Sequence, residues 1–311
     1  MNGLYMNGKP KVGDGSPQAP IRIFERGLQR RRLLRALAKS PADFLLTRAA
    51  EDLVERLATV NRSFAACLDL GTPGPELAQR LAAVPNIHVV RLAPLPQTIA
   101  PIPILNLIGD EEALPFAPGS FDLVVSALAL HAVNDLPGAL VQIRQALKPD
   151  GLLLACLAGG RTLHELRTAF ALAETEILGG ISPRIAPFVD VRDMGGLLQR
   201  AGFALPVADI EPLTVRYDTM FDLMADLRAM GATNTMSERA RRPLRPAILI
   251  RAAEVYAERF SDPDGRVRAT FELLFISGWA PHESQQKPLP PGSAKISLAE
   301  ALGTTETKLK P

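Results

Sequence analysis

Residues 109–126 read GDEEALPFAPGSFDLVVS, and this stretch decides the fold. Its end belongs to a short apolar run, 121–127, of the length typical of a buried strand. Its beginning, with Asp110 and Glu111, directly follows another strand-like run at 104–108. In open α/β sheets, ligands bind beyond the carboxyl ends of the strands. The stretch therefore predicts two strands joined by a loop on the ligand-binding edge of a sheet.

The rest of the chain alternates between strand-like and helix-like segments. Further strands are expected at 64–70, 88–92 and 152–157, and helices at 42–57, 75–83, 137–147, 162–178 and 191–201. This alternation predicts a parallel, doubly wound α/β sheet. Two later strands, 203–217 and 269–279, enclose a helical stretch at 219–260, which fits a hairpin closing the sheet edge. The tetrad Lys148-Pro149-Asp150-Gly151 is predicted to form a turn before the strand at 152–157.

Composition limits the class of protein. The 311 residues are 47% apolar and 22% charged, which indicates a globular chain with a sizeable core. A net charge of +2 is too small to indicate a nucleic-acid partner. Cys67 and Cys156 lie far apart in the sequence, each within an apolar run. This placement argues against a disulfide framework or a zinc site. Apolar runs stay well short of the roughly 18 residues that a transmembrane helix needs, so we expect a soluble intracellular protein.

Four regions are expected along the chain. Residues 1–20 are predicted to be a flexible leader, 21–60 N-terminal helices, 61–284 the main domain with a helical insertion at about 219–260, and 285–311 a flexible tail. Residues 21–39 hold seven basic side chains against one acid, Glu25. This basic helix leaves four roles open: a targeting presequence, a helix that gives peripheral membrane association, a cover over a substrate site, or a partly solvated helix.

Three motifs together resemble the class I S-adenosylmethionine (SAM)-dependent methyltransferases: the loop at 109–116, the strand at 121–127 and the tetrad at 148–151. The resemblance implies a Rossmann-like sheet of seven strands, with a helical cap from the N-terminus and the insertion. It implies SAM as cofactor, with the aspartate matching Asp110 bound to the adenine amino group. The cofactor-binding residues that it implies are Asp69, Gly71, Gly74, Asp110, Glu111 and Ser126.

Further segments narrow the resemblance to one subgroup. IFER at 23–26, LALHAVNDLP at 128–137, GGRTLHELR at 159–167 and HES at 282–284 are similar to the methyltransferase-like assembly factor of respiratory complex I. Members of that family hydroxylate an arginine of a quinone-module subunit. The resemblance therefore implies a protein substrate or partner for this chain. The segment FDLMADLRAMG at 221–231 is also similar to the carboxyl methyltransferases of malonyl-acyl carrier protein.

The chain departs from the family where the cofactor should bind. Gly71 and Gly74 remain in the first turn, but Pro73 replaces a glycine and removes an N–H donor. The end of the second strand, near Leu92, has no acid to accept the two ribose hydroxyls. Each lost charged hydrogen bond costs about 1.5–3 kcal/mol. We therefore expect SAM binding to be weakened or lost, and Asp69 either binds the cofactor or only holds the turn.

The sequence assigns no catalytic residue and offers His131 as a candidate for a general base. The other histidines lack the spacing of metal ligands, so no metal site is expected. We expect the modified side chain to lie between Arg26, His131 and the cap, and the arginines of the insertion would favour an acidic protein surface.

Three functions stay open. The leading hypothesis is a SAM-dependent methyltransferase-like protein that modifies a protein by arginine hydroxylation in complex I assembly. The alternatives are a carboxyl O-methyltransferase of the malonyl-acyl carrier protein type and a non-catalytic assembly chaperone with a degenerate SAM site. The expected location is a bacterial-type cytoplasm, or the mitochondrial matrix if the source is eukaryotic.

Overall fold

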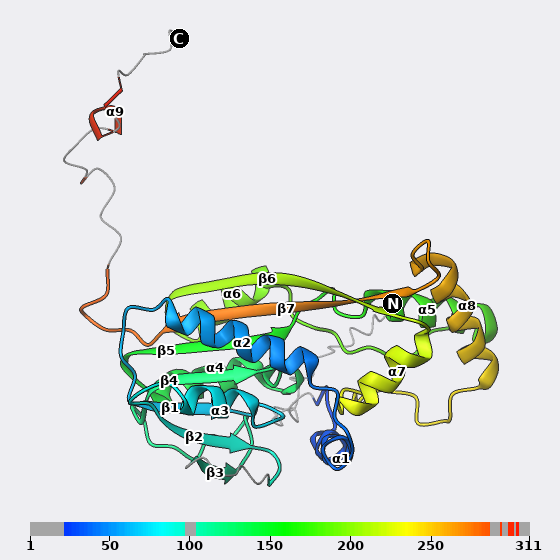
Figure 1. Cartoon of the computed structure of the whole chain (residues 1–311), viewed down its shortest axis with the longest axis horizontal. Helices are drawn as coiled ribbons and strands as arrows, with labels where there is room; N and C mark the ends of the chain where they lie inside the picture. The colour runs from blue at the N-terminus through cyan, green and yellow to red at the C-terminus, as the bar shows by residue number, and fades with distance from the viewer. Residues whose placement is uncertain (1–21, 97–103, 287–292, 294–297, 302, 305–311) are drawn as a thin grey trace, which may run out of the picture.

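The computed structural model describes residues 22–96, 104–286, 293, 298–301 and 303–304. Within these residues, seven strands form one sheet in the order β3-β2-β1-β4-β5-β7-β6 (Figure 1). The strands are β1 (Ala66–Leu70), β2 (His88–Ala93), β3 (Leu105–Ile108), β4 (Phe121–Ala127), β5 (Leu147–Ala158), β6 (Ala204–Tyr217) and β7 (Val267–Trp279). The first five pair in parallel, and β7 is antiparallel to both neighbours. The predicted seven-stranded α/β sheet and its closing hairpin are confirmed.

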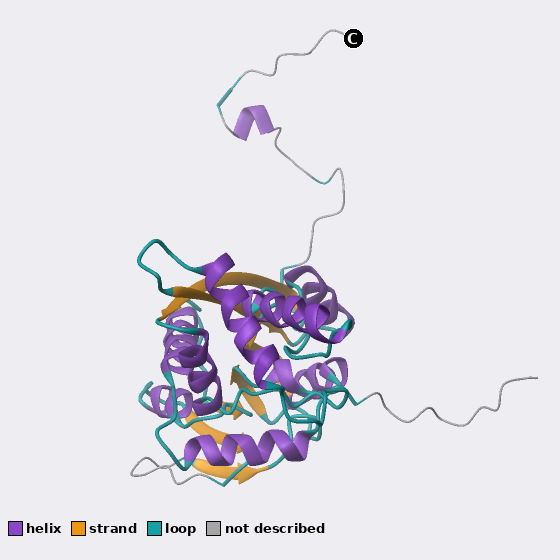
Figure 2. Ribbon diagram, turned by 90° about the vertical axis from the view of Figure 1, so that its right-hand side faces the viewer, coloured by secondary structure: helices purple, strands orange, loops and turns teal. Residues whose placement is uncertain are grey.

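Helices cover both faces of this sheet (Figure 2). One apolar core joins it to α2 (Phe44–Ala58) and α3 (Glu76–Ala82), and the other joins it to α4 (Leu136–Ala146) and α6 (Val191–Arg200). Consecutive residues of β4 serve opposite cores, Leu123 one and Val124 the other. Because both faces are buried, the central strands need continuous apolar runs, which is the pattern seen in the sequence.

A third apolar core forms a cap beyond the carboxyl ends of the parallel strands. It packs α5 (His164–Leu178), α7 (Met220–Ala229) and α8 (Pro246–Phe260) against the far ends of β6 and β7 (Figure 1). The helix α1 (Arg26–Leu37) contacts α7 and completes the cap expected from the N-terminus and the insertion. The remaining helical elements are the short 3-10 helix η1 (Leu130–Ala132) and α9 (Leu298–Ala301).

The helical stretch expected at 219–260 consists of two helices, α7 and α8. It breaks after α7, where Gly231 takes a left-handed φ of +72°. A Cβ on Gly231 would lie 2.9 Å from the Cα of Leu33, so only glycine lets the insertion approach α1 this closely. The break is therefore fixed by contact with a helix some two hundred residues earlier.

The predicted turn at Lys148-Pro149-Asp150-Gly151 is a bulge inside β5. Phe121 pairs with Leu147, and Leu123 pairs with Leu152. Between these two pairs β5 has more residues than β4, and the extra residues form the bulge. The left-handed residue of the bulge is Asp150, at φ +63°, and its carboxylate accepts a hydrogen bond of 2.9 Å from Gln285 Nε2. Aspartate tolerates this conformation better than most side chains. The turn residues were recognised, but their role was wrong.

No helix among the described residues is long and apolar enough to cross a membrane. The expected leader at 1–20 lies outside the described residues, as does most of the expected tail at 285–311.

We expect Gly278→Ala to destabilise the protein by about 1–3 kcal/mol through overpacking. Gly278 lies on β7, which pairs with both β5 and β6. A Cβ added to it would lie 2.9 Å from the Cβ of Phe203. The matched control is Gly195→Ala in α6, where a Cβ meets nothing within 4 Å. It should stabilise by roughly 0.5–1 kcal/mol. Urea unfolding measures both, and equal effects would contradict the packing described.

Candidate functional site

The candidate site lies where the loops after β1, β4 and β5 meet the cap. These elements enclose a cavity of about 390 Å³. The first loop contributes Pro73 and Gly74, the start of α3 contributes Glu76, and the segment after β4 contributes His131. Most of the other lining side chains are apolar and come from α1, α2, α5, α7 and the loop after α7. The cavity is thus at the sheet edge where α/β folds bind ligands.

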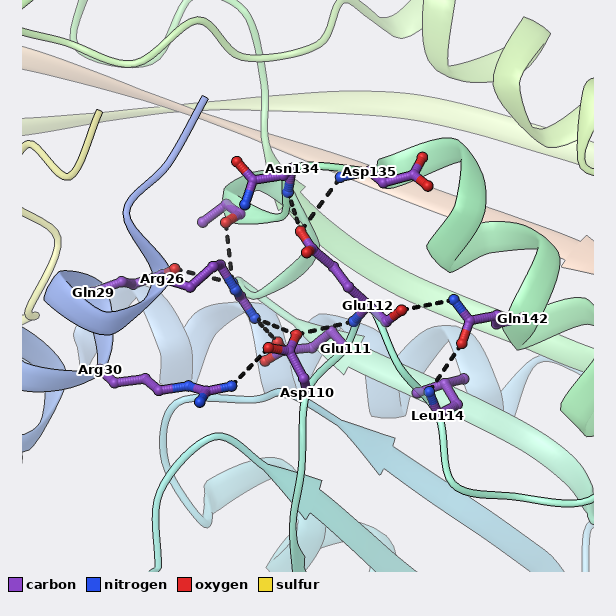
Figure 3. Close-up of polar contacts among 11 residues, drawn as sticks. Arg26, Gln29, Arg30, Asp110, Glu111, Glu112, Leu114, Asn134, Asp135 and Gln142 are labelled. Atoms are coloured by element: carbon purple, nitrogen blue, oxygen red, sulfur yellow. Dashed lines mark hydrogen bonds and ion pairs between the residues drawn. The ribbon is translucent and has the colours of Figure 1, made fainter. Parts of the chain in front are cut away.

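Beside the cavity, Arg26 of α1 joins three segments (Figure 3). Its guanidinium lies 3.0 Å from Asp110 Oδ1, contacts the Glu111 carboxylate, and donates a 3.1 Å hydrogen bond to the Ala132 carbonyl. Arg30, one turn later, lies 2.7 Å from the other oxygen of Asp110. Both acids expected to serve the cofactor are therefore ion-paired with α1.

Backbone contacts hold α1 in this position. The N–H of Phe24 donates to Asn134 Oδ1 at 2.8 Å, and the N–H of Glu25 donates to the Thr235 carbonyl at 2.8 Å. The Glu112 carboxylate in turn accepts from the N–H groups of Asn134 and Asp135 (Figure 3). The polar residues of the 128–137 motif thus connect α1 to the loop after β3.

Burial and the arginines act in opposite directions on the two acids. Burial raises the pKa of Asp110, but the N–H of Glu112, Arg26 and Arg30 outweigh it and leave that pKa below its usual value. Burial also raises the pKa of Glu111, and there Arg26 compensates only in part. Glu111 is 4% exposed, so its charge depends on Arg26.

The loop after β1 is held from beneath by a second ion pair. Asp69 and Arg91 face each other in the register of β1 and β2, are fully buried, and approach to 3.3 Å. Arg91 also donates to the carbonyls of Thr72 at 2.5 Å and Gly74 at 3.0 Å, while the Thr72 hydroxyl donates to Asp69. Burial raises the pKa of Asp69, and Arg91 opposes this. These contacts favour the role of Asp69 in holding the turn.

Two further expected cofactor residues also have partners within the protein. Gly71 has φ +72°, and a Cβ there would lie 2.6 Å from Glu111 Cγ, so the acid packs directly on this glycine. The hydroxyl of Ser126 donates to the Leu70 carbonyl at 2.7 Å. Gly71, Asp110 and Glu111 are therefore brought together, whereas Asp69 and Ser126 support the strand ends.

The residues do not fit the adenosine half of SAM in this arrangement of α1. Arg26 and Arg30 occupy the carboxylate oxygens of Asp110, and Glu111 fills the space next to Gly71. The end of β2 presents buried Leu92 and Ala93 and supplies no acid. The departures from the family sequence and the contacts made by α1 thus both disfavour the binding of SAM.

His131 lines the cavity with its ring edge-to-face against Phe188, at 5.6 Å between centroids. Burial lowers its pKa to about 4, so the imidazole is neutral near pH 7. Its Nδ1 is buried and has no hydrogen-bond partner among the described residues. Arg26 does not line the cavity, because its guanidinium is engaged by the two acids. The expectation that the modified side chain lies between Arg26, His131 and the cap stays a prediction, and of the two side chains only His131 lines this cavity.

Sequence reasoning missed two charged residues. Arg91 is the charged residue of the otherwise largely apolar strand β2, and a register placing it opposite Asp69 could have revealed the pair. Glu76 begins α3 and lines the cavity, but a glutamate in the first turn of a helix carries no distinctive signal. Among the described residues, no group of three His, Cys, Asp or Glu side chains could hold a metal ion.

We expect Arg26→Ala to cost about 3 kcal/mol of stability at pH 8, because it leaves the buried Glu111 charge unpaired. The deficit should shrink as the pH falls to 5. Glu111 already has a raised pKa, which rises further without Arg26, so the folded variant takes up a proton that the unfolded chain releases. Arg31→Ala, an exposed arginine on the same helix, should change stability by less than about 0.5 kcal/mol. Urea unfolding at both pH values measures the free energy of unfolding of each variant. Equal changes in the two variants would contradict the ion pair assigned between Arg26 and Glu111.

Known proteins share this architecture. Residues 68–155 match the family model of a methyltransferase domain. The mitochondrial arginine-hydroxylase NDUFAF5 of Mus musculus is 41% identical over 303 residues, covering 94% of this chain and 88% of that protein. The malonyl-[acyl-carrier protein] O-methyltransferase of Halorhodospira halophila is 35% identical over 261 residues, covering 80% and 85%. The solved structure of the [4+2]-cyclase SpnF has the same fold, with a TM-score of 0.52 at 15% identity over 85% of this chain and 98% of that one. The chain belongs to the class I methyltransferase family that includes the arginine-hydroxylase NDUFAF5.

Proposed function

We propose that this chain hydroxylates an arginine side chain of a protein during the assembly of respiratory complex I. The observation that carries the proposal is the 41% identity to an arginine-hydroxylase over 94% of the chain. The match covers 94% of the chain, so it includes sequence that forms the loops and the cap as well as the sheet. The substrate is then a protein whose arginine enters the cavity between the sheet edge and the cap.

The cavity suits a long side chain with an apolar stem. Phe24, Leu33 and Phe188 are among the apolar residues that line it. A malonyl group carries a free carboxylate and would need a cation in this space. Of the two arginines in the lining, Arg184 is ion-paired with the buried Glu174, and Arg228 is exposed on α7. These features favour an arginine substrate over the carboxylate of the malonyl-acyl carrier protein enzymes.

Hydroxylation replaces one C–H bond of the substrate by C–OH and requires an oxidant as co-substrate. The residues described here bind the side chain, orient it and keep water away, which is how positioning lowers a barrier. His131 is neutral and lines the cavity, so its imidazole is available to accept a hydrogen bond from the substrate and to orient it. SAM, if it binds, would have to displace Arg26 from Asp110 and Glu111, and its binding is proposed to be weak.

A second candidate, a non-catalytic assembly chaperone, is favoured by one observation. Asp110 and Glu111, in the loop after β3, are engaged by α1 rather than free for a cofactor. Under either proposal the partner is a protein. The proposed location is the cytoplasm for a bacterial source and the mitochondrial matrix for a eukaryotic one, where the named relatives are mitochondrial.

The test deletes the gene in its host and analyses complex I subunits by peptide mass spectrometry. We expect one arginine to lose the mass of an oxygen atom and to regain it when the natural chain is restored. Complementation with His131→Ala should lower hydroxylation at least about tenfold, since misplacing a reacting group by about 1 Å can cost roughly 10²-fold. His88→Ala, an exposed histidine on β2, is the control and should restore hydroxylation fully.

Restored assembly without any hydroxylated arginine would overturn the enzyme in favour of the chaperone. An unchanged hydroxylation level in the His131→Ala strain would remove His131 from the reaction.

A further inference from the structure

We propose that the cavity is a guanidinium-binding pocket in which Glu76 is the carboxylate that pairs with the substrate cation. This assignment rests on the proposed function and adds the residue that selects the substrate. It follows from the charges and the unsatisfied polar atoms that line the cavity.

Glu76 contributes a carboxylate to the cavity lining. Its side chain folds back over the loop after β1, where it fills the space that a Cβ on Gly74 would take. Its Oε2 is buried and accepts no hydrogen bond from the described residues, and no ion pair involving Glu76 is found among them. The neighbouring charges, Asp69 and Arg91, already neutralise each other beneath the same loop. A buried carboxylate oxygen without a partner is costly, so the site is completed by a donor from outside.

The cavity lining has a second buried polar atom without a hydrogen-bond partner among the described residues, and this atom too can accept a hydrogen bond. His131 Nδ1 has no partner, and the imidazole is neutral near pH 7. A guanidinium brings five N–H donors in a planar fork and no acceptor. One carboxylate oxygen and one imidazole nitrogen therefore match two of the donors of a guanidinium.

The walls of the cavity suit the rest of an arginine side chain. An aromatic and apolar lining packs against the methylene stem and leaves the charged head to the polar atoms. The protein's own Arg184 already lies this way, with its guanidinium 5.9 Å from the centre of the Phe170 ring and its charge paired with Glu174. Both residues of that stacked pair line the cavity. The other carboxylate of the lining, Asp43, is exposed.

The test is a calorimetric titration of the full chain with two probes, N-acetyl-arginine amide and N-acetyl-citrulline amide. Citrulline has nearly the same shape but no charge. We expect the natural chain to bind the arginine probe at least tenfold more tightly than the citrulline probe. Glu76→Gln should remove this preference, and Glu76→Asp, which keeps the charge, should retain part of it. Asp193→Asn, an exposed acid on α6, should leave the preference unchanged.

The proposal is overturned if the natural chain shows no preference for the arginine probe, if Glu76→Gln retains the preference, or if Asp43→Asn removes it instead. Unfolding midpoints of each variant separate loss of binding from loss of folding. The two proposals can fail separately. Arginine-selective binding without a hydroxylated subunit in the cell would sink the proposed function and leave the pocket standing. Hydroxylation that is unaffected by Glu76→Gln would do the reverse.

Discussion

The ion pairs between Arg26 and the acids Asp110 and Glu111 are the interaction on which the candidate site depends. They connect an N-terminal helix to a loop more than eighty residues later, and the Ala132 carbonyl adds the segment after β4 (Figure 3). The same helix contributes Leu33 to the lining of the cavity. One element therefore closes the side where adenosine would bind and shapes the side where a substrate would bind. A ligand that moved α1 would change both.

A second constraint acts from below the loop after β1. The buried Asp69–Arg91 pair and the hydrogen bonds from Arg91 to two loop carbonyls fix the path of Thr72 to Gly74. A buried pair of this kind adds little net stability, but losing one partner leaves a charge that the interior cannot solvate. The pair thus serves to hold the loop in one conformation. That conformation places Glu76 at the cavity, with its Oε2 accepting no hydrogen bond from the described residues.

Much of the fold follows from local sequence, whereas the site does not. Continuous apolar runs such as 121–127 predicted the central strands, because burial on both faces demands them. The tetrad at 148–151 was recognised as turn chemistry, but only its pairing with β4 makes it a bulge. The break of the insertion at Gly231 depends on contact with Leu33, and the partner of Arg26 depends on how α1 docks. Such contacts join residues far apart in the chain, and no local pattern specifies them.

The central claim is that the acids on the adenosine side are engaged by the protein's own arginines. The most direct measurement is a calorimetric titration of the full chain with S-adenosylhomocysteine, whose adenosine half is that of SAM. We expect a dissociation constant weaker than about 100 μM, since the ligand must first break the ion pairs of Arg26 and Arg30. A low-micromolar or tighter constant would contradict it, because the adenosine site would then be open to the cofactor with α1 in place.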